Sequence, residues 1–209
     1  MIEKYKNKIR LQLLVIYTRY LLGNAFVFAS LIKIKGLRFT SKSGLNQPIN
    51  SAWHFFETLY ESGLYWKFIG FGQFVTGFLL MTQKYAKLGS LIYFPIMLNI
   101  FIITISYYFA FTPIITGLML LANLFLIVWD WDTLKILINK PLSINDNPRL
   151  EKEISWQIIG LIMFLFTFCY RLFVNVYEIL FWAIGCIIIG LIGLLMGLDL
   201  YKIKFENKI

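Results

Sequence analysis

Six apolar segments divide the chain, and each is about as long as a bilayer is thick. Because about 20 apolar residues in a helix cross a ~30 Å hydrocarbon layer, and lipid offers the backbone no hydrogen-bond partner, each segment is predicted to be a transmembrane helix. The sequence therefore predicts an all-α, polytopic membrane bundle. The predicted spans are Leu11–Ile34, Leu64–Thr82, Leu88–Phe109, Pro113–Trp131, Ser155–Val174 and Glu178–Tyr201.

Composition agrees with this pattern and excludes several classes of protein. Of the 209 residues, 59% are hydrophobic and 15% are charged, whereas soluble domains have about 45–50% and about 25%. An ordinary soluble enzyme, a nucleic-acid-binding module and a disordered chain are therefore excluded. The formal charge of +9 is explained by basic loops that set membrane topology, so no nucleic-acid partner is predicted.

The distribution of lysine and arginine predicts the orientation of the chain. The first apolar segment contains Arg19 and Asn24 and is longer than the apolar part of a signal peptide, so we expect it to be retained as a span. With the N-terminus in the cytoplasm, thirteen cations fall on the cytoplasmic side and six outside. This bias favours both termini in the cytoplasm. The six outer cations are Lys33, Lys35, Arg38, Lys42, Lys67 and Arg171.

Two polar stretches separate the spans into groups. Within 35–63, a short helix near 50–61 is predicted, because Ser51 or Asn50 could cap it and Trp53, Phe56 and Tyr60 have helical spacing. We expect it to lie flat in the outer interface or to fold against the mouth of the bundle. The stretch 132–153 is predicted to be a cytoplasmic connector. The domain boundary is placed within it, so that 1–138 is a four-helix region and 139–209 contains the rest of the connector and a two-helix hairpin.

Charged groups at membrane depth indicate one ion pair. A charge inside a span is costly, and with both termini inside, Arg19 lies at the same membrane level as Asp130 and Asp132. We predict that Arg19 pairs with Asp130 and, less favourably, with Asp132. The alternative is that Arg19 reaches out to the headgroups while both aspartates face water.

Four amide side chains lie nearer the middle of the spans: Asn24, Gln73, Asn99 and Asn123. They could form a polar layer that bridges the helices, or they could line a small cavity. Pro95 would bend its helix within the same layer and free a backbone carbonyl. Helix packing is the favoured interpretation, and the cavity would suit a small-solute transporter.

On the outer side, His54 and Glu57 have i, i+3 spacing on the predicted short helix, and Lys33 lies at the same level. Such a group could handle protons or bind a quinone carbonyl. A lone histidine among aromatic residues is more often an anchor at the membrane interface, and that interpretation is favoured.

Small residues in the last span indicate close helix packing. Gly190, Gly193 and Gly197 permit helix backbones to approach, either within the chain or in a homodimer. The two cysteines, Cys169 and Cys186, form no CxxC pair, so neither a dithiol centre nor a metal site is predicted.

Several short motifs of the first part of the chain recur in a known family. They are Arg19-Tyr-Leu-Leu-Gly23-Asn-Ala-Phe26 with Ser30 and Lys33, the run from Gly63 to Thr82, Tyr85-Ala86 to Gly89, Pro95 to Asn99, and Thr112-Pro113 through Asn123 to Trp129-Asp130. In these motifs the chain resembles the DoxX family over about 11–138. That resemblance implies a four-helix membrane bundle, to which the last two helices are an addition. It also implies an association with quinone-linked oxidoreductase systems or with redox-stress complexes.

From these observations we expect a bacterial inner-membrane protein that is a subunit or accessory of a redox or stress-response complex, without its own active site. Its expected partners are the lipid bilayer, proteins of that complex and a possible second copy. Two alternatives are a quinone-reactive oxidoreductase subunit using Lys33, His54 and Glu57, and a solute transporter using the amides. The sequence argues against independent redox catalysis, because it has no CxxC, haem-type histidine pair or Gly-rich nucleotide loop. A quinone is the one cofactor considered.

Overall fold

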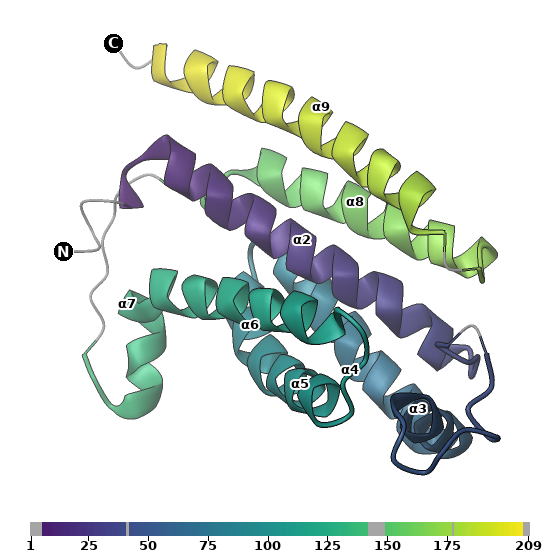
Figure 1. The fold of residues 1–209 in the computed structure, drawn as a ribbon. Helices are drawn as coiled ribbons and strands as arrows, with labels where there is room; N and C mark the ends of the chain where they lie inside the picture. Colours follow the sequence, from purple (N-terminus) through teal and green to yellow (C-terminus); the bar gives the residue numbers. More distant parts are fainter. Residues whose placement is uncertain (1–5, 41, 142–148, 177, 207–209) are drawn as a thin grey trace.

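The computed structural model describes residues 6–40, 42–141, 149–176 and 178–206, with side chains up to 198, and all regular structure in these residues is helical (Figure 1). Six helices in this part of the chain are long and apolar enough to cross a membrane. They confirm the predicted spans and indicate a multi-pass membrane protein. The elements are α2 (Ile9–Ile34), α3 (Ala52–Glu61), α4 (Leu64–Met81), α5 (Ala86–Ser106), α6 (Thr112–Trp129), α7 (Trp131–Leu134), η1 (Lys135–Ile138), η2 (Leu150–Lys152), α8 (Ile154–Phe173) and α9 (Ile179–Glu206).

Helix α2 is the centre of the bundle. It packs against α4, α6 and α8, and Figure 1 shows it between α8 on one side and α4–α6 on the other. In the most apolar 18-residue stretch of each helix, 72% of the α2 stretch is buried, but only 11% of the α9 stretch. The outermost helix therefore leaves most of its surface to lipid, whereas the polar residues of α2 lie inside protein.

Helix α8 shares a core with the first helices of the chain. Tyr20 of α2, Met81 of α4 and Trp156 of α8 are among the residues of one buried cluster. Phe74 of α4 packs on Phe164 and Phe168, with ring centroids 5.4 and 5.9 Å apart. The C-terminal pair of helices is thus joined to the first four through α8, and α9 packs mainly on α8.

The short helix predicted near 50–61 is present as α3. The hydroxyl of Ser51 caps it by accepting a hydrogen bond from the backbone N–H of His54 at 3.2 Å. The Trp53 ring lies 5.2 Å from that of Phe109, and the Phe55 ring stacks on Tyr107 at 4.5 Å. Because Tyr107 and Phe109 belong to the turn between α5 and α6, α3 folds against the mouth of the bundle, the second of its two expected positions.

The connector between α6 and α8 is more than a polar linker. Part of it, 142–148, lies outside the described residues. The following turn, η2, returns to the bundle, where Leu150 is fully buried and its backbone N–H donates to the side-chain oxygen of Gln12 at 2.7 Å. The connector thus places Leu150 and Glu151 in the interior of the bundle, which its polar composition did not predict.

Candidate functional site

A buried charge cluster lies at the end of the bundle where α2 begins and α6 ends. Nη2 of Arg19 is 2.7 Å from Oδ2 of Asp130, and its Nη1 is 2.9 Å from Oε2 of Glu151 and 3.0 Å from Oε1 of Gln83. The predicted pair of Arg19 and Asp130 is therefore present. The alternative in which Arg19 reaches the headgroups is wrong, because its side chain is only 1% exposed.

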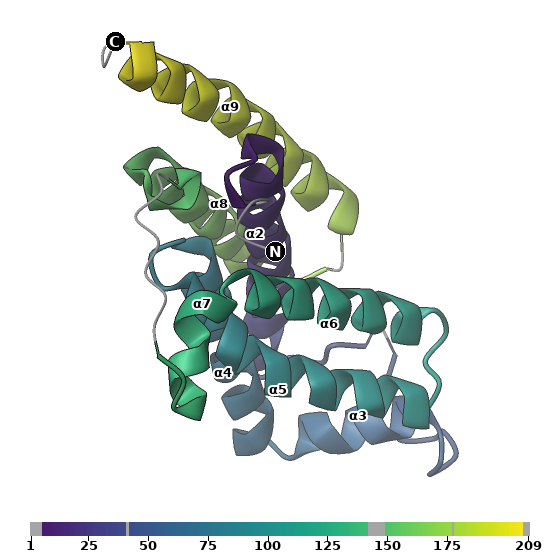
Figure 2. The ribbon, with the colours of Figure 1, turned by 90° about the vertical axis from the view of Figure 1, so that its left-hand side faces the viewer.

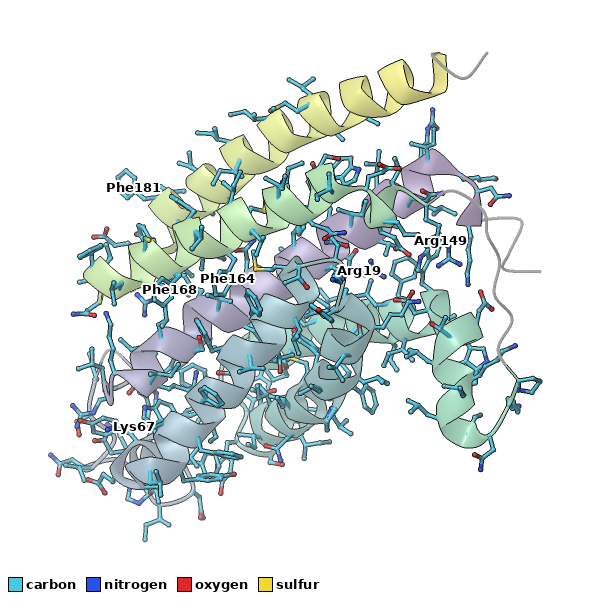
Figure 3. The ribbon with its side chains drawn as sticks, turned by 180° about the vertical axis from the view of Figure 1, so that it is seen from behind. Arg19, Lys67, Arg149, Phe164, Phe168 and Phe181 are labelled. Carbon is cyan, nitrogen blue, oxygen red and sulfur yellow. The ribbon has the colours of Figure 1, made fainter. Side chains whose placement is uncertain are left out.

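A second set of charges surrounds this pair. Asp132 is not a partner of Arg19 but forms an ion pair with Lys6 and lies 3.9 Å from Nη2 of Arg149. Nη1 of Arg149 lies 3.3 Å from Oε1 of Glu151. Figure 3 shows Arg19 and Arg149 at the same end of the molecule, with Lys67 at the other. The described contacts thus connect three cations and three carboxylates: Lys6, Arg19, Arg149, Asp130, Asp132 and Glu151.

The charge cluster holds together parts of the chain that are distant in sequence. Burial raises the pKa of Glu151, but the positive charges of Arg19 and Arg149 outweigh that effect and hold it below its usual value. Glu151 therefore stays ionised as a second counter-ion for Arg19. The guanidinium of Arg19 on α2 links the end of α6, the turn after α4 and η2, so the cluster fixes the end of the bundle where α2 begins.

Glu151 and Gln83 could not be recognised in the sequence as partners of Arg19. Glu151 stands in a polar stretch with several charges, and Gln83 in a turn with Lys84, where both would normally be solvated. The one feature of the sequence that indicated burial of Glu151 was the apolar residue next to it, Leu150.

The four amides do not form a single polar layer. Asn24 accepts a hydrogen bond from the Thr167 hydroxyl at 2.7 Å, and that hydroxyl accepts one from Nε1 of Trp182 at 2.9 Å. These bonds connect α2, α8 and α9. In the other half of the bundle, Nδ2 of Asn123 donates to the Ser90 carbonyl at 3.2 Å and links α6 to α5.

The other two amides differ from the expectation in different ways. Gln73 is buried, and its side-chain oxygen has no hydrogen-bond partner among the described residues. Asn99 is exposed. Helix α5 buries the face that carries Tyr93 and Met97, and a residue two positions after Met97 points roughly to the opposite side of a helix. The prediction that Asn99 turns inward is therefore wrong.

At the opposite end of the bundle, Glu57 is bound by Arg38. Nε of Arg38 lies 3.0 and 2.9 Å from the two carboxylate oxygens, and the backbone N–H of Gly44 donates to Oε2 at 2.9 Å. The side chain of Glu57 is only 1% exposed. The hydrogen bonds from Arg38 hold the pKa of this carboxyl below its usual value. This pair fixes the loop before α3 to the helix itself.

The structure does not bring Lys33, His54 and Glu57 together as one site. The ammonium of Lys33 donates to the Ala29 carbonyl at 2.7 Å and lies 4.8 and 5.2 Å from the ring centres of Phe39 and Trp66. His54 is half-buried, and its Nδ1 has no hydrogen-bond partner among the described residues. Helical spacing put His54 and Glu57 near each other on α3, but Arg38 takes the carboxylate.

We expect Glu57→Gln to loosen the loop 38–50 in a pH-dependent manner. Since the folded pKa of Glu57 is lowered, its carboxylate stabilises the fold above the ordinary pKa of about 4.5, and this contribution is lost as the pH falls through the lower folded value. Hydrogen exchange of the loop amides should therefore be faster in the variant at pH 7. The difference from the unmodified chain should shrink in acid.

Glu61→Gln is the matched control for this prediction, because Glu61 is an exposed carboxylate on the same helix that acts on Arg38 through its charge, whereas Glu57 forms the ion pair. It should leave the exchange of the loop almost unchanged at either pH. Equal effects of the two substitutions at pH 7 would show that the pair of Arg38 and Glu57 does not hold the loop.

The glycines of α9 pack within the chain. A Cβ atom on Gly193 would lie 2.7 Å from Ile159, and one on Gly197 would lie 2.6 Å from Trp156. The backbone carbonyl of Gly190 accepts a hydrogen bond from the Tyr17 hydroxyl at 2.7 Å. These contacts explain the small residues of α9 by its packing on α8 and α2, so they give no support to a homodimer.

Comparisons with protein-family models, with curated proteins and with solved structures found no match to this chain. The resemblance to the DoxX family therefore stays a proposal.

Proposed function

We propose that this chain is a membrane subunit or accessory of a redox or stress-response complex in a bacterial inner membrane, with both termini in the cytoplasm. The redox or stress association comes from the DoxX resemblance of 11–138, and the orientation comes from the thirteen cations assigned to one side and six to the other. The bilayer environment is supported by the six apolar helices.

The observation that carries the accessory role is the use of polar side chains inside the bundle. A binding pocket directs a few polar groups toward its ligand. Here, Arg19 binds Asp130 and Glu151, and Asn24 binds Thr167. Because these groups bind one another, they position helices, and the outer surface of the bundle remains as the place where a partner protein would bind.

The proposal can be tested by purifying the tagged full chain from its native membranes in a mild detergent. We expect it to elute as a complex larger than the chain with its micelle, and to enrich an NADH- or quinol-dependent reductase activity. The matched control is an unrelated six-span protein with the same tag and expression level. Elution of the chain alone, with reductase activity no higher than in the control, would overturn the proposal.

The same preparation distinguishes the accessory role from a quinone-reactive subunit. If the chain has no quinone site of its own, the chain separated from its partners carries no stoichiometric menaquinone, and His54→Ala leaves its lipid content unchanged. Stoichiometric quinone that is lost in His54→Ala would favour the quinone-reactive subunit instead.

A further inference from the structure

The chain turns sharply after α6 and forms a surface segment, 131–140, that includes α7 and η1. Figures 1 and 2 show it leaving the end of α6 and running across the direction of that helix instead of along it. It starts at the charge cluster, since Asp130 binds Arg19. An element that runs across a membrane-spanning helix at its end lies along the membrane surface.

The surface segment exposes large apolar side chains. The exposed fractions are 42% for Trp131, 51% for Ile136, 65% for Leu137 and 52% for Ile138. Leu134 is buried and fixes the segment to the bundle. Exposed apolar side chains on a membrane-flanking segment suit the boundary between headgroups and acyl chains better than water. Val128, near the end of α6, is also exposed, at 51%.

The charges around the surface segment are positive. Lys135 and Lys140 lie on it, whereas its one carboxylate, Asp132, forms an ion pair with Lys6. Lys84 belongs to the turn between α4 and α5 and Lys87 to the first turn of α5; both follow Gln83, which binds Arg19 at the same end of the bundle. Lysines beside an apolar patch at the membrane surface attract anionic lipid headgroups.

We propose that 131–140 is an interfacial anchor that inserts Trp131, Ile136, Leu137 and Ile138 into one leaflet and binds anionic phospholipid headgroups through Lys135 and Lys140. The occupant is lipid, because the exposed apolar side chains directly follow the end of a helix long and apolar enough to span a membrane, and the two lysines complement phosphate. This inference goes beyond the proposed function and does not depend on which protein complex the chain joins.

The test uses the full chain with Cys169 and Cys186 replaced by serine and a single Leu137→Cys that carries an environment-sensitive fluorophore. The chain is reconstituted in phosphatidylcholine vesicles with or without phosphatidylglycerol. We expect blue-shifted emission, strong quenching by a nitroxide lipid labelled near its carbonyl, and weak quenching by aqueous iodide. Quenching by the nitroxide lipid should increase with phosphatidylglycerol, and Lys135→Gln with Lys140→Gln should remove that increase.

A label at Asn46→Cys is the control, because this exposed residue belongs to the loop before α3. Its emission should not depend on phosphatidylglycerol. A label at Ile138→Cys gives a second position if Leu137→Cys does not fold. Iodide quenching at 137 or 138 that is unaffected by lipid composition would overturn the proposal. A blue shift that disappears when the protein is diluted among vesicles would also overturn it, because a second copy of the chain would then cover the face. Because the purified chain is used alone, this result is independent of the pull-down.

Discussion

Arg19→Leu is expected to lower the free energy of unfolding by about 3–5 kcal/mol, the usual cost of removing one partner from a buried ion pair. The substitution leaves Asp130 and Glu151 buried without the guanidinium that lies 2.7 and 2.9 Å from them. Unfolding in mixed micelles with increasing SDS, followed by circular dichroism, measures the effect. A loss of folded protein during purification would be the same outcome in a stronger form.

Arg10→Leu is the matched control for Arg19→Leu, because Arg10 is an exposed arginine of the same helix. We expect a change within about 0.5 kcal/mol for this substitution. A double-mutant cycle of Arg19→Leu with Asp130→Leu should give a coupling energy of about 1–3 kcal/mol. If the two substitutions are additive, the close contact between these side chains does not stabilise the fold.

The parts of the structure that follow from hydrophobic pattern could be predicted from the sequence. The six spans needed only the length of the apolar segments, and α3 needed only Ser51 and the spacing of its aromatic residues. The pair of Arg19 and Asp130 followed from their common level in the membrane, since a buried arginine needs a counter-ion. These arguments use the chain's position relative to the bilayer and require no knowledge of how the helices face one another.

The remaining contacts depend on which face each helix turns inward. Asn99 was expected in a polar layer, but the rotation of α5 buries Tyr93 and Met97 instead. Thr167 had no special sign in its sequence, although it joins Asn24 to Trp182. Low contrast between the faces of a membrane helix explains these differences, because apolar residues occupy both the lipid-facing and the protein-facing sides.

Contacts at the ends of the bundle were also difficult to predict from the sequence, because long polar side chains there have several candidate partners. Glu57 was expected near His54, but the chain before α3 brings Arg38 to its carboxylate. Glu151 reaches Arg19 only because η2 folds back onto α2. Both carboxylates are positioned by segments that connect the long helices. The spacing of apolar residues predicts the face of a helix, but it does not predict the course of such a connecting segment.

Gly160→Ala is expected to lower the free energy of unfolding by about 2–3 kcal/mol, because a methyl group cannot be accommodated where α8 meets α2 and α4. A Cβ atom at this position would lie 1.9 Å from the carbonyl oxygen of Met81 and 2.8 Å from the ring of Tyr20. The first contact is with backbone, so relief requires a shift of α8 as a whole. The same SDS unfolding experiment measures the effect.

Gly72→Ala is the control, since the nearest atom to its added Cβ is a side-chain carbon of Ile96 at 3.8 Å, an ordinary contact distance. Alanine favours a helix over glycine by about 0.5–1 kcal/mol, so this variant should be neutral or more stable than the unmodified chain. Opposite signs for the two substitutions would establish that α8 belongs to the same packed core as α2 and α4. Equal effects would mean that α8 is not packed tightly against α2 and α4 at Gly160.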